Sequence, residues 1–144
     1  AERCRPWRVG VELRHPSWFD GAAAADTVTF LREQGLSFVC VDMPQGFASS
    51  VPPILVTTAD LAVVRFHGHS DAWDSGDKQD RFRYAYGEEE LRRWAELLIE
   101  LADQSAELHV LLNNCCGDQA QRDAARLAEL LAERRAVSGT PVSS

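Results

Sequence analysis

Four short apolar segments recur along the chain, and each ends in polar residues or turn formers. They are WRVGVELR at 7–14, LSFVCVDM at 36–43, LAVVRFHG at 61–68 and LHVLLNNC at 108–115. Their length and their content of Val, Leu and Phe predict buried strands. Because segments of helical or mixed character separate them, the pattern predicts parallel strands joined by right-handed crossovers.

Three of the intervening segments carry the period of a helix. The clearest is 88–103, where apolar residues recur three and four positions apart. Segments near 22–34, which Gly35 would terminate, and about 118–135 are predicted to be helical as well. The prolines of 44–60 predict a loop instead.

The connection between the third strand and the 88–103 helix is long, about twenty residues. Loops of this length in a compact domain are typical of functional sites or of disorder. Trp73, Phe82, Tyr84 and Tyr86 lie in it, so we expect it to be ordered. We expect its aromatic residues to cover the carboxyl ends of the strands, because the loop starts at such an end.

The composition is that of a soluble globular domain, with 144 residues, 45% of them hydrophobic and 26% charged. A net charge of −7 disfavours nucleic acid and anionic membranes as partners. Apolar runs are too short for a membrane span, and the N-terminal segment has no apolar signal region, so we expect a cytoplasmic protein. The four cysteines show no C-x-x-C spacing and are expected to be reduced thiols.

Charged side chains occur in or just after the predicted strands, where a parallel sheet is normally apolar on both faces. They are Glu12, Arg14, Asp42, Arg65 and His67. Burying them is costly unless they pair with one another or touch water. Alternation gives each strand one apolar face for the helices and one face that becomes polar toward the carboxyl end. We therefore expect the five to form one cluster, on the lumen side of a β/α barrel.

Five segments carry a resemblance to a known family. VELRHPSWF, VDMP, VVRFHG, RYAYGEEELRRWA and HVLLNNCCGDQAQRDAARLAELL resemble successive blocks of the YecE-like family, also called domain of unknown function seventy-two. The match runs in order from residue 9 to about 131. The family is similar to a TIM-type β/α barrel and implies no settled activity.

The resemblance also implies that half of the fold is absent from this chain. Family members are nearly twice as long, and the blocks of their N-terminal half do not occur here. A barrel of this kind uses about 250 residues for eight units. The expected fold is therefore α/β: four parallel β/α units over 1–136, the C-terminal half of a TIM-like barrel, with a disordered tail at 137–144. Two positions depart from the family pattern, His69 in place of the usual Arg and Asp123 in place of Asn.

Glu12, Asp42 and His67 are the candidate catalytic residues, because charged groups at strand carboxyl ends are enriched in functional sites. Two carboxylates and a histidine could supply a general acid and base. The alternative interpretation is structural: the carboxylates would pair with Arg14 and Arg65, and the histidine would bond to a neighbouring carboxylate.

Five further residues are candidates for binding a substrate. Arg14 and Arg65 could clamp a phosphate or carboxylate, and Trp73 could contact a ligand from the long loop. Asn113 and Asn114 end the fourth strand; one should reach the lumen and orient a hydroxyl, while the other caps the turn.

The sequence names no cofactor and favours no metal site, although carboxylates plus one histidine could hold a divalent ion in an isomerase-like site. His67 and His69 form H-x-H, which resembles a metal pair in some barrel hydrolases, but the family pattern does not require His69. A calcium loop is disfavoured because the acidic long loop lacks the ligand spacing of an EF-hand. Cys115 and Cys116 lie near the rim, but no activating base is evident beside them.

The leading functional hypothesis is an enzyme, or part of one, that acts on a small polar or anionic molecule. A hydrolase, lyase or isomerase is indicated by fold analogy alone. The alternative is a catalytically inactive truncated or split module that binds a ligand or its missing N-terminal half. An open half-barrel would have unpaired strand edges and an uncovered face including Phe38, Cys40 and Val63, so we expect self-association or a need for the missing half.

Overall fold

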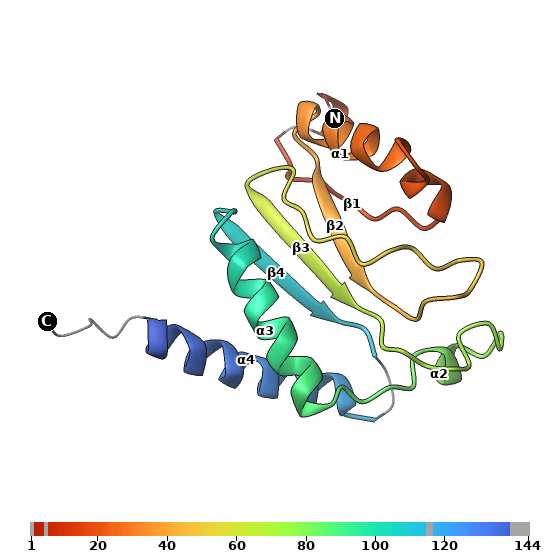
Figure 1. The fold of residues 1–144 in the computed structure, drawn as a ribbon, viewed down its shortest axis with the longest axis vertical. Helices are drawn as coiled ribbons and strands as arrows, with labels where there is room; N and C mark the ends of the chain where they lie inside the picture. Colours follow the sequence, from red (N-terminus) through yellow and green to blue (C-terminus); the bar gives the residue numbers. More distant parts are fainter. Residues whose placement is uncertain (1, 5, 115–116, 139–144) are drawn as a thin grey trace, which may run out of the picture.

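All four predicted strands are present and pair in parallel in the order of the sequence (Figure 1). The computed structural model describes residues 2–4, 6–114 and 117–138. The strands are β1 (Gly10–Val11), β2 (Ser37–Asp42), β3 (Leu61–Phe66) and β4 (Glu107–Leu112). β2 aligns Val39 with Val63 of β3, and β3 aligns Val63 with His109 of β4. The α/β class predicted from the sequence is therefore confirmed.

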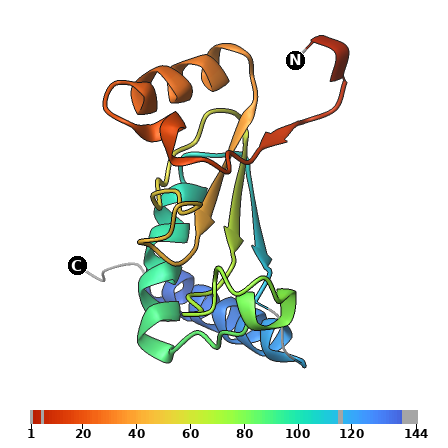
Figure 2. The same ribbon diagram turned by 90° about the vertical axis from the view of Figure 1, so that its right-hand side faces the viewer.

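The three predicted helices are also present. They are α1 (Ala23–Glu33), α3 (Glu88–Ala102) and α4 (Gln119–Ser138), and a short α2 (Lys78–Arg81) lies in the long loop. Two 3-10 turns, Glu2–Cys4 and Pro16–Phe19, complete the described elements. Figure 2 shows α1 and α3 on the same side of the sheet. The predicted tail starts too early, because α4 continues to Ser138; the remainder, 139–144, lies outside the described residues.

The main core lies between the sheet and these helices, as alternation along the strands predicted. Phe38 and Cys40 from β2 and Val64 and Phe66 from β3 are almost completely buried in it. The ring of Phe66 meets that of Trp94 on α3 edge to face, with centroids 4.7 Å apart. Aromatic pairs in this geometry add stability beyond the area that they bury.

The segment between β2 and β3 takes the place of a helix on that side of the sheet. Residues 43–60 contain no helix or strand, as their prolines predicted. The hydroxyl of Thr58 accepts a hydrogen bond from the Phe38 amide at 2.7 Å, and the Val56 carbonyl accepts the Cys40 thiol at 3.7 Å. Burial raises the pKa of that thiol to about 11, so Cys40 is a core residue and not a nucleophile at neutral pH.

The second face of the sheet is buried as well, which corrects one expectation. Val39, Val41, Leu61 and Val63 form a separate apolar cluster there with Trp73. Phe38 and Cys40 do not belong to this face, because they point to the helices, and Val63 is only 9% exposed. Met43, Val51 and Trp73 pack on this face, so Val63, which was expected to be uncovered, is buried.

The two outer strands differ from the two central ones. All six residues of β2 are buried, whereas those of β4 alternate between exposed and half-buried, and Leu111 is 46% exposed. β1 is only two residues long. Within the described part of the chain, β1 and β4 each pair with one strand alone. Both sheet edges are therefore open to a further strand.

Candidate functional site

Glu12 is the centre of a charged group on the second face, just beyond the end of β1. Its carboxylate forms an ion pair with Arg65 of β3 and accepts a hydrogen bond from Nη1 of Arg14 at 2.9 Å. Nε2 of His67 lies 3.6 Å from Oε1 of Glu12, too far for a good hydrogen bond. Four of the five charged residues predicted to cluster are thus brought together here.

The environment of Glu12 keeps it ionised. Partial burial alone would raise the pKa of its carboxyl group. The adjacent His67 and Arg65 outweigh burial and lower that pKa from 4.5 to about 2. Glu12 is therefore a carboxylate throughout the physiological range, suited to accept hydrogen bonds or balance a cation.

His67 is buried without hydrogen bonds. Its side chain is 2% exposed, and neither ring nitrogen has a hydrogen-bond partner among the described residues. Trp73 and Phe82 of the long loop flank the imidazole, with centroid distances of 6.1 and 5.9 Å. A buried polar group of this kind is uncommon and costs stability unless a ligand or water satisfies it.

Trp73 holds the long loop over this group, as its position in the sequence predicted. Its indole Nε1 donates to Oγ of Ser49 at 3.0 Å, which ties the loop to the segment after β2. The guanidinium of Arg81 stacks 4.8 Å from the ring centroid and donates through Nε to the Trp73 carbonyl. The side chain is 1% exposed, so a ligand could reach His67 only if this loop moved.

Asp42 does not join the Glu12 group, and the expectation of a single cluster is wrong in this respect. Asp42 alternates with Phe38 and Cys40 and therefore points to the helix side of the sheet. Its carboxylate accepts hydrogen bonds from Nε2 of His69, at 2.8 and 2.9 Å, and from the hydroxyl of Tyr86, at 2.7 Å. Two separate polar groups thus lie at the carboxyl edge, one on each side.

His69 and Tyr86 are site residues that the sequence did not single out in these roles. The signal was the H-G-H motif: Gly68 has φ +79° and lets the chain turn His69 toward Asp42. A Cβ on Gly68 would lie 2.5 Å from Cβ of Tyr84, so no other residue fits without movement. The Gly68 amide also donates to the Tyr86 hydroxyl at 2.9 Å.

The two asparagines after β4 separate. Asn113 is exposed, and its alternation with Leu111 places it on the second face. Asn114 is fully buried and donates to the Tyr84 carbonyl at 2.9 Å and to the Asp123 carboxylate at 2.6 Å. Asp123, on α4, also accepts a hydrogen bond from the backbone amide of Tyr86, just before α3. Asn114 and Asp123 together therefore connect the start of α3 to α4. Cys115 and Cys116 lie outside the described residues.

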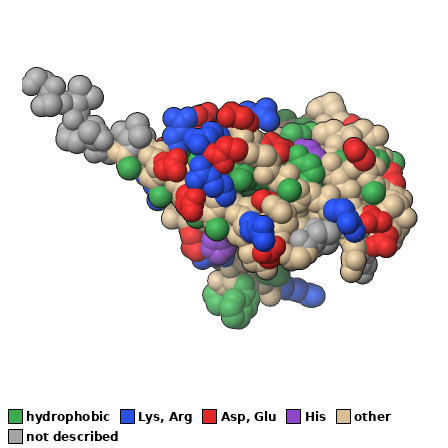
Figure 3. Space-filling view, turned by 90° about the horizontal axis from the view of Figure 1, so that it is seen from below, with side chains coloured by type: hydrophobic (Ala, Val, Ile, Leu, Met, Phe, Trp, Pro, Cys, Tyr) green, Lys and Arg blue, Asp and Glu red, His purple; other side chains and the backbone are tan. Residues whose placement is uncertain are grey.

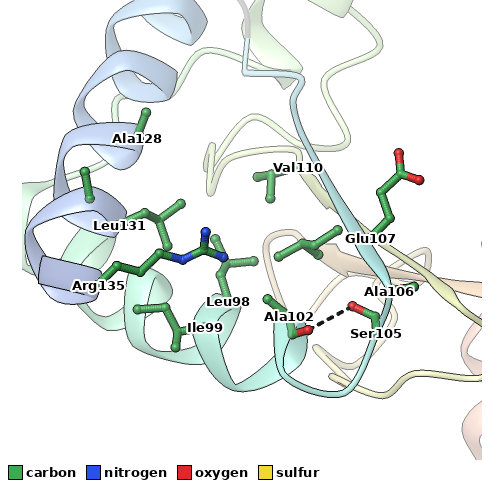
Figure 4. A pocket seen from close by; sticks show the side chains of 12 residues that line it. Leu98, Ile99, Ala102, Ser105, Ala106, Glu107, Val110, Ala128, Leu131 and Arg135 are labelled. Carbon is green, nitrogen blue, oxygen red and sulfur yellow. Dashed lines mark hydrogen bonds between the residues drawn. The ribbon is translucent and has the colours of Figure 1, made fainter. Parts of the chain in front are cut away.

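Two apolar grooves lie along the edges of the sheet, away from both polar groups. The larger, about 500 Å³, runs between α3, α4 and β4 and is seen in Figure 4 with Leu98, Leu131 and Val110 around it. The other, about 410 Å³, lies beside β1 and α1, where Trp18 and Phe30 are 51% and 57% exposed.

Across residues 2–4, 6–114 and 117–138, no three His, Cys, Asp or Glu side chains are arranged to hold a metal ion. In that same part of the chain, no helix combines the length and the apolar character that crossing a bilayer requires. From below, acidic and basic side chains are interspersed, without a field of one sign (Figure 3).

Comparison with known proteins places the chain in a family. A profile described as "Protein of unknown function DUF72" matches residues 1–143. The chain belongs to the DUF72 family. The UPF0759 protein YunF of Bacillus subtilis is 33% identical over 128 residues, which are 84% of this chain and 45% of that protein.

Solved DUF72 structures resemble the chain closely. A DUF72 family protein of Thermotoga maritima is 36% identical with a TM-score of 0.80, and the match covers 88% of this chain and 47% of that one. A DUF72 family protein of Enterococcus faecalis is 26% identical with a TM-score of 0.85, covering 91% and 50%. The chain therefore spans about half the length of these DUF72 relatives.

Proposed function

We propose that this DUF72 chain forms part of an enzyme site, located at the carboxyl edge of half of a TIM-like barrel, for a small polar or anionic molecule. The observation that carries the proposal is His67. A histidine that is buried, unsatisfied and 3.6 Å from an ionised carboxylate has a cost that a bound ligand would offset.

The proposed roles follow from the contacts. Glu12 and His67 are the acid–base candidates, since one is held ionised and the other has both ring nitrogens available. Arg65 and Arg14 can bind an anionic group, because each guanidinium has donors beyond those used on Glu12. Trp73 serves as the lid contact.

The two asparagines and Asp42 have different proposed roles. Asn113, exposed on the second face, is retained as a substrate-binding candidate. Asn114 is given a structural role, because its amide donors are used on Tyr84 and Asp123. Asp42 acts from the other side of the sheet, through His69.

Ligand binding to the ¹⁵N-labelled chain tests the proposal. Inorganic phosphate, acetate and glycerol would be titrated separately while side-chain resonances of histidine and arginine are followed by NMR. We expect phosphate or acetate to shift His67 and Arg65. Arg65→Met should weaken that binding at least about tenfold, the cost of one charged contact.

Arg92→Met is the matched control, because Arg92 is half-exposed on α3 and pairs with Glu88, away from the Glu12 group. It should leave the binding unchanged. Equal losses in the two variants, or shifts that avoid His67 and Arg65 altogether, would contradict the proposed site.

A second candidate function is docking of the part of DUF72 relatives that this chain does not match, which the proposal takes to be their N-terminal half. The supporting observation is the pair of apolar grooves, one at each open edge of the sheet. A strand added to β4 together with a helix laid against α4 would fill the larger groove and complete the edge. The relatives have the necessary length, since this chain matches only 45–50% of each.

Co-expression with the N-terminal half of the Bacillus subtilis relative, followed by light scattering, tests this docking. A 1:1 complex is expected, and Leu131→Glu in the groove should abolish it. Ala125→Glu, on an exposed position of α4, should not. A homodimer in place of the complex would identify a second copy as the occupant, and a monomer that ignores the added half would overturn the docking proposal.

A further inference from the structure

We propose that His69, oriented by Asp42, is a proton-transfer residue whose Nδ1 receives the proton of a ligand hydroxyl. It deepens the proposed function by adding a base on the helix side of the same edge. The two assignments can fail separately, because the Glu12 group and the Asp42 group share no side chain.

The contact between the two residues fixes which ring nitrogen of His69 carries the proton. Both carboxylate oxygens of Asp42 lie within hydrogen-bond distance of Nε2 of His69, at 2.9 and 2.8 Å. A carboxylate can only accept, so Nε2 carries the proton. The neutral imidazole then has its lone pair on Nδ1, the arrangement in which a carboxylate orients a catalytic histidine.

The carboxylate is itself held in place. Tyr86 donates its hydroxyl proton to Oδ2 of Asp42 at 2.7 Å and accepts the Gly68 amide at 2.9 Å. Burial and the nearby Asp42 raise the pKa of Tyr86, so the phenol remains a donor. Because Asp42 is 4% exposed, its carboxylate reaches a ligand only through His69.

His69 is accessible where His67 is not. The side chain of His69 is 35% exposed against 2% for His67. Among the described residues, the hydrogen bonds of His69 use Nε2 and leave Nδ1 unengaged. The hydrogen bond that His69 donates to Asp42 raises the pKa of His69 above its ordinary value of 6.5.

The surroundings favour a hydroxyl over an anion. The ring of Tyr84 lies 5.3 Å from the imidazole, and the Tyr84 hydroxyl donates to both oxygens of Glu90. Two carboxylates near one histidine disfavour an anionic ligand. A half-buried aromatic ring beside carboxylate acceptors suits a polyol or sugar, whose hydroxyl groups donate and whose carbon face can lie on the ring.

The proposed step moves one proton. The hydroxyl proton of the ligand passes to Nδ1, the electrons of the O–H bond stay on the oxygen, and the imidazolium charge is balanced by Asp42. The transfer changes no oxidation state and therefore needs no oxidant or reductant.

NMR of the full chain tests the geometry. Long-range ¹H–¹⁵N spectra report which ring nitrogen carries the proton. We expect neutral His69 to be protonated on Nε2, to titrate above 6.5, and to titrate lower in Asp42→Asn. Protonation on Nδ1, or titration at or below 6.5, would overturn the assignment.

Glucose, glycerol and inorganic phosphate then test the ligand class. Glucose or glycerol should shift the His69 resonances in a saturable way, and phosphate should not. His69→Arg distinguishes a proton-accepting role of His69 from a role as the cationic partner of Asp42. Arginine keeps a cation against Asp42 but cannot accept a proton. That variant should fold, and its Tyr84 and Glu90 resonances should no longer respond to the polyols as in the unaltered chain.

Reactivity supplies an independent measurement. The Nδ1 lone pair of a neutral imidazole attacks a carbonyl of diethylpyrocarbonate; a C–N bond forms, the ring proton leaves, and ethanol and CO₂ are released. We expect His69 to react at least about tenfold faster than His67, because it is more exposed. Equal rates, or polyols that leave His69 unmoved while phosphate shifts it, would refute the proposal.

Discussion

Two carboxylate–histidine pairs flank Gly68 and behave differently. On the second face, Glu12 lies 3.6 Å from His67, and the histidine is sealed without hydrogen bonds. On the helix side, Asp42 holds His69 at 2.8 Å, and the histidine is partly open to solvent. In the first pair the carboxylate is the more exposed member, and in the second it is the histidine.

The difference shows how one glycine divides a short motif between two sites. His67 continues the alternation of β3 and so faces the side opposite Phe66. The positive φ of Gly68 then interrupts this alternation, and His69 points to the helix side, toward Asp42. Residues of the same type, two positions apart, therefore have different partners and different accessibility.

Replacing the glycine should have the largest effect, because it disturbs both pairs. Gly68→Ala puts a Cβ 2.5 Å from Cβ of Tyr84 at φ +79°. We expect a loss of about 4 kcal/mol in the free energy of unfolding, the sum of backbone strain and overpacking. Urea unfolding at fixed protein concentration measures it.

Gly76→Ala is the matched control. Gly76 has φ +81° in the same loop, but a Cβ there would meet nothing within 4 Å. Only the backbone strain applies there, so the free energy of unfolding should fall by about 1 kcal/mol. Similar losses in the two variants would show that Tyr84 can move aside.

Neutralising the carboxylates should affect the Asp42 pair more than the Glu12 pair. Asp42→Asn removes a buried charge that bonds to His69 and Tyr86, and should cost about 3 kcal/mol. Glu12→Gln leaves Arg14 and Arg65 partly solvated and should cost about 2 kcal/mol. The reverse order in urea unfolding would mean that the Glu12 group is the more tightly coupled one.

The two pairs should lose their stabilisation at opposite ends of the pH range. The lowered pKa of Glu12 gives stability that is complete above about pH 4.5 and is lost as pH falls toward 2. The raised pKa of His69 gives stability that is complete below 6.5 and is lost as pH rises through the folded-state value.

Variants isolate each contribution. The stability difference between the unaltered chain and Glu12→Gln should shrink between pH 4.5 and 2, and the difference from His69→Gln should shrink on the alkaline side. Differences that stay constant across these windows would argue against the pKa shifts. Urea unfolding in matched buffers provides both curves.

Removing the unsatisfied histidine should have the smallest effect on stability. His67→Leu replaces two buried nitrogens without partners by an apolar group of similar size, so stability should change by less than about 1 kcal/mol. His69→Leu, which leaves the Asp42 carboxylate without its imidazole partner, should be clearly less stable. A loss above about 2 kcal/mol in His67→Leu would reveal a structural bond to His67.

Much of the candidate site could be predicted from the sequence. Glu12, Arg14, Arg65 and His67 meet on one face because each follows from strand alternation and from the shared carboxyl edge of a parallel sheet. The position of Trp73 over this edge followed from its place after β3. Alternation with Phe38 and Cys40 already placed Asp42 on the helix side. Because Asp42 is charged, it was nevertheless expected to join the group around Glu12.

By itself, the sequence determined the four parallel strands, the helices and the apolar face of each strand, because these depend on local periodicity and on burying continuous apolar surface. Only the tertiary structure decided the partners of the polar groups. Asp42 meets the Tyr86 hydroxyl 44 residues further along the chain, and 44–60 crosses the helix side without forming a helix. Such contacts depend on how the loops pack over the sheet. The local sequence pattern does not show which residues far apart in the chain will meet.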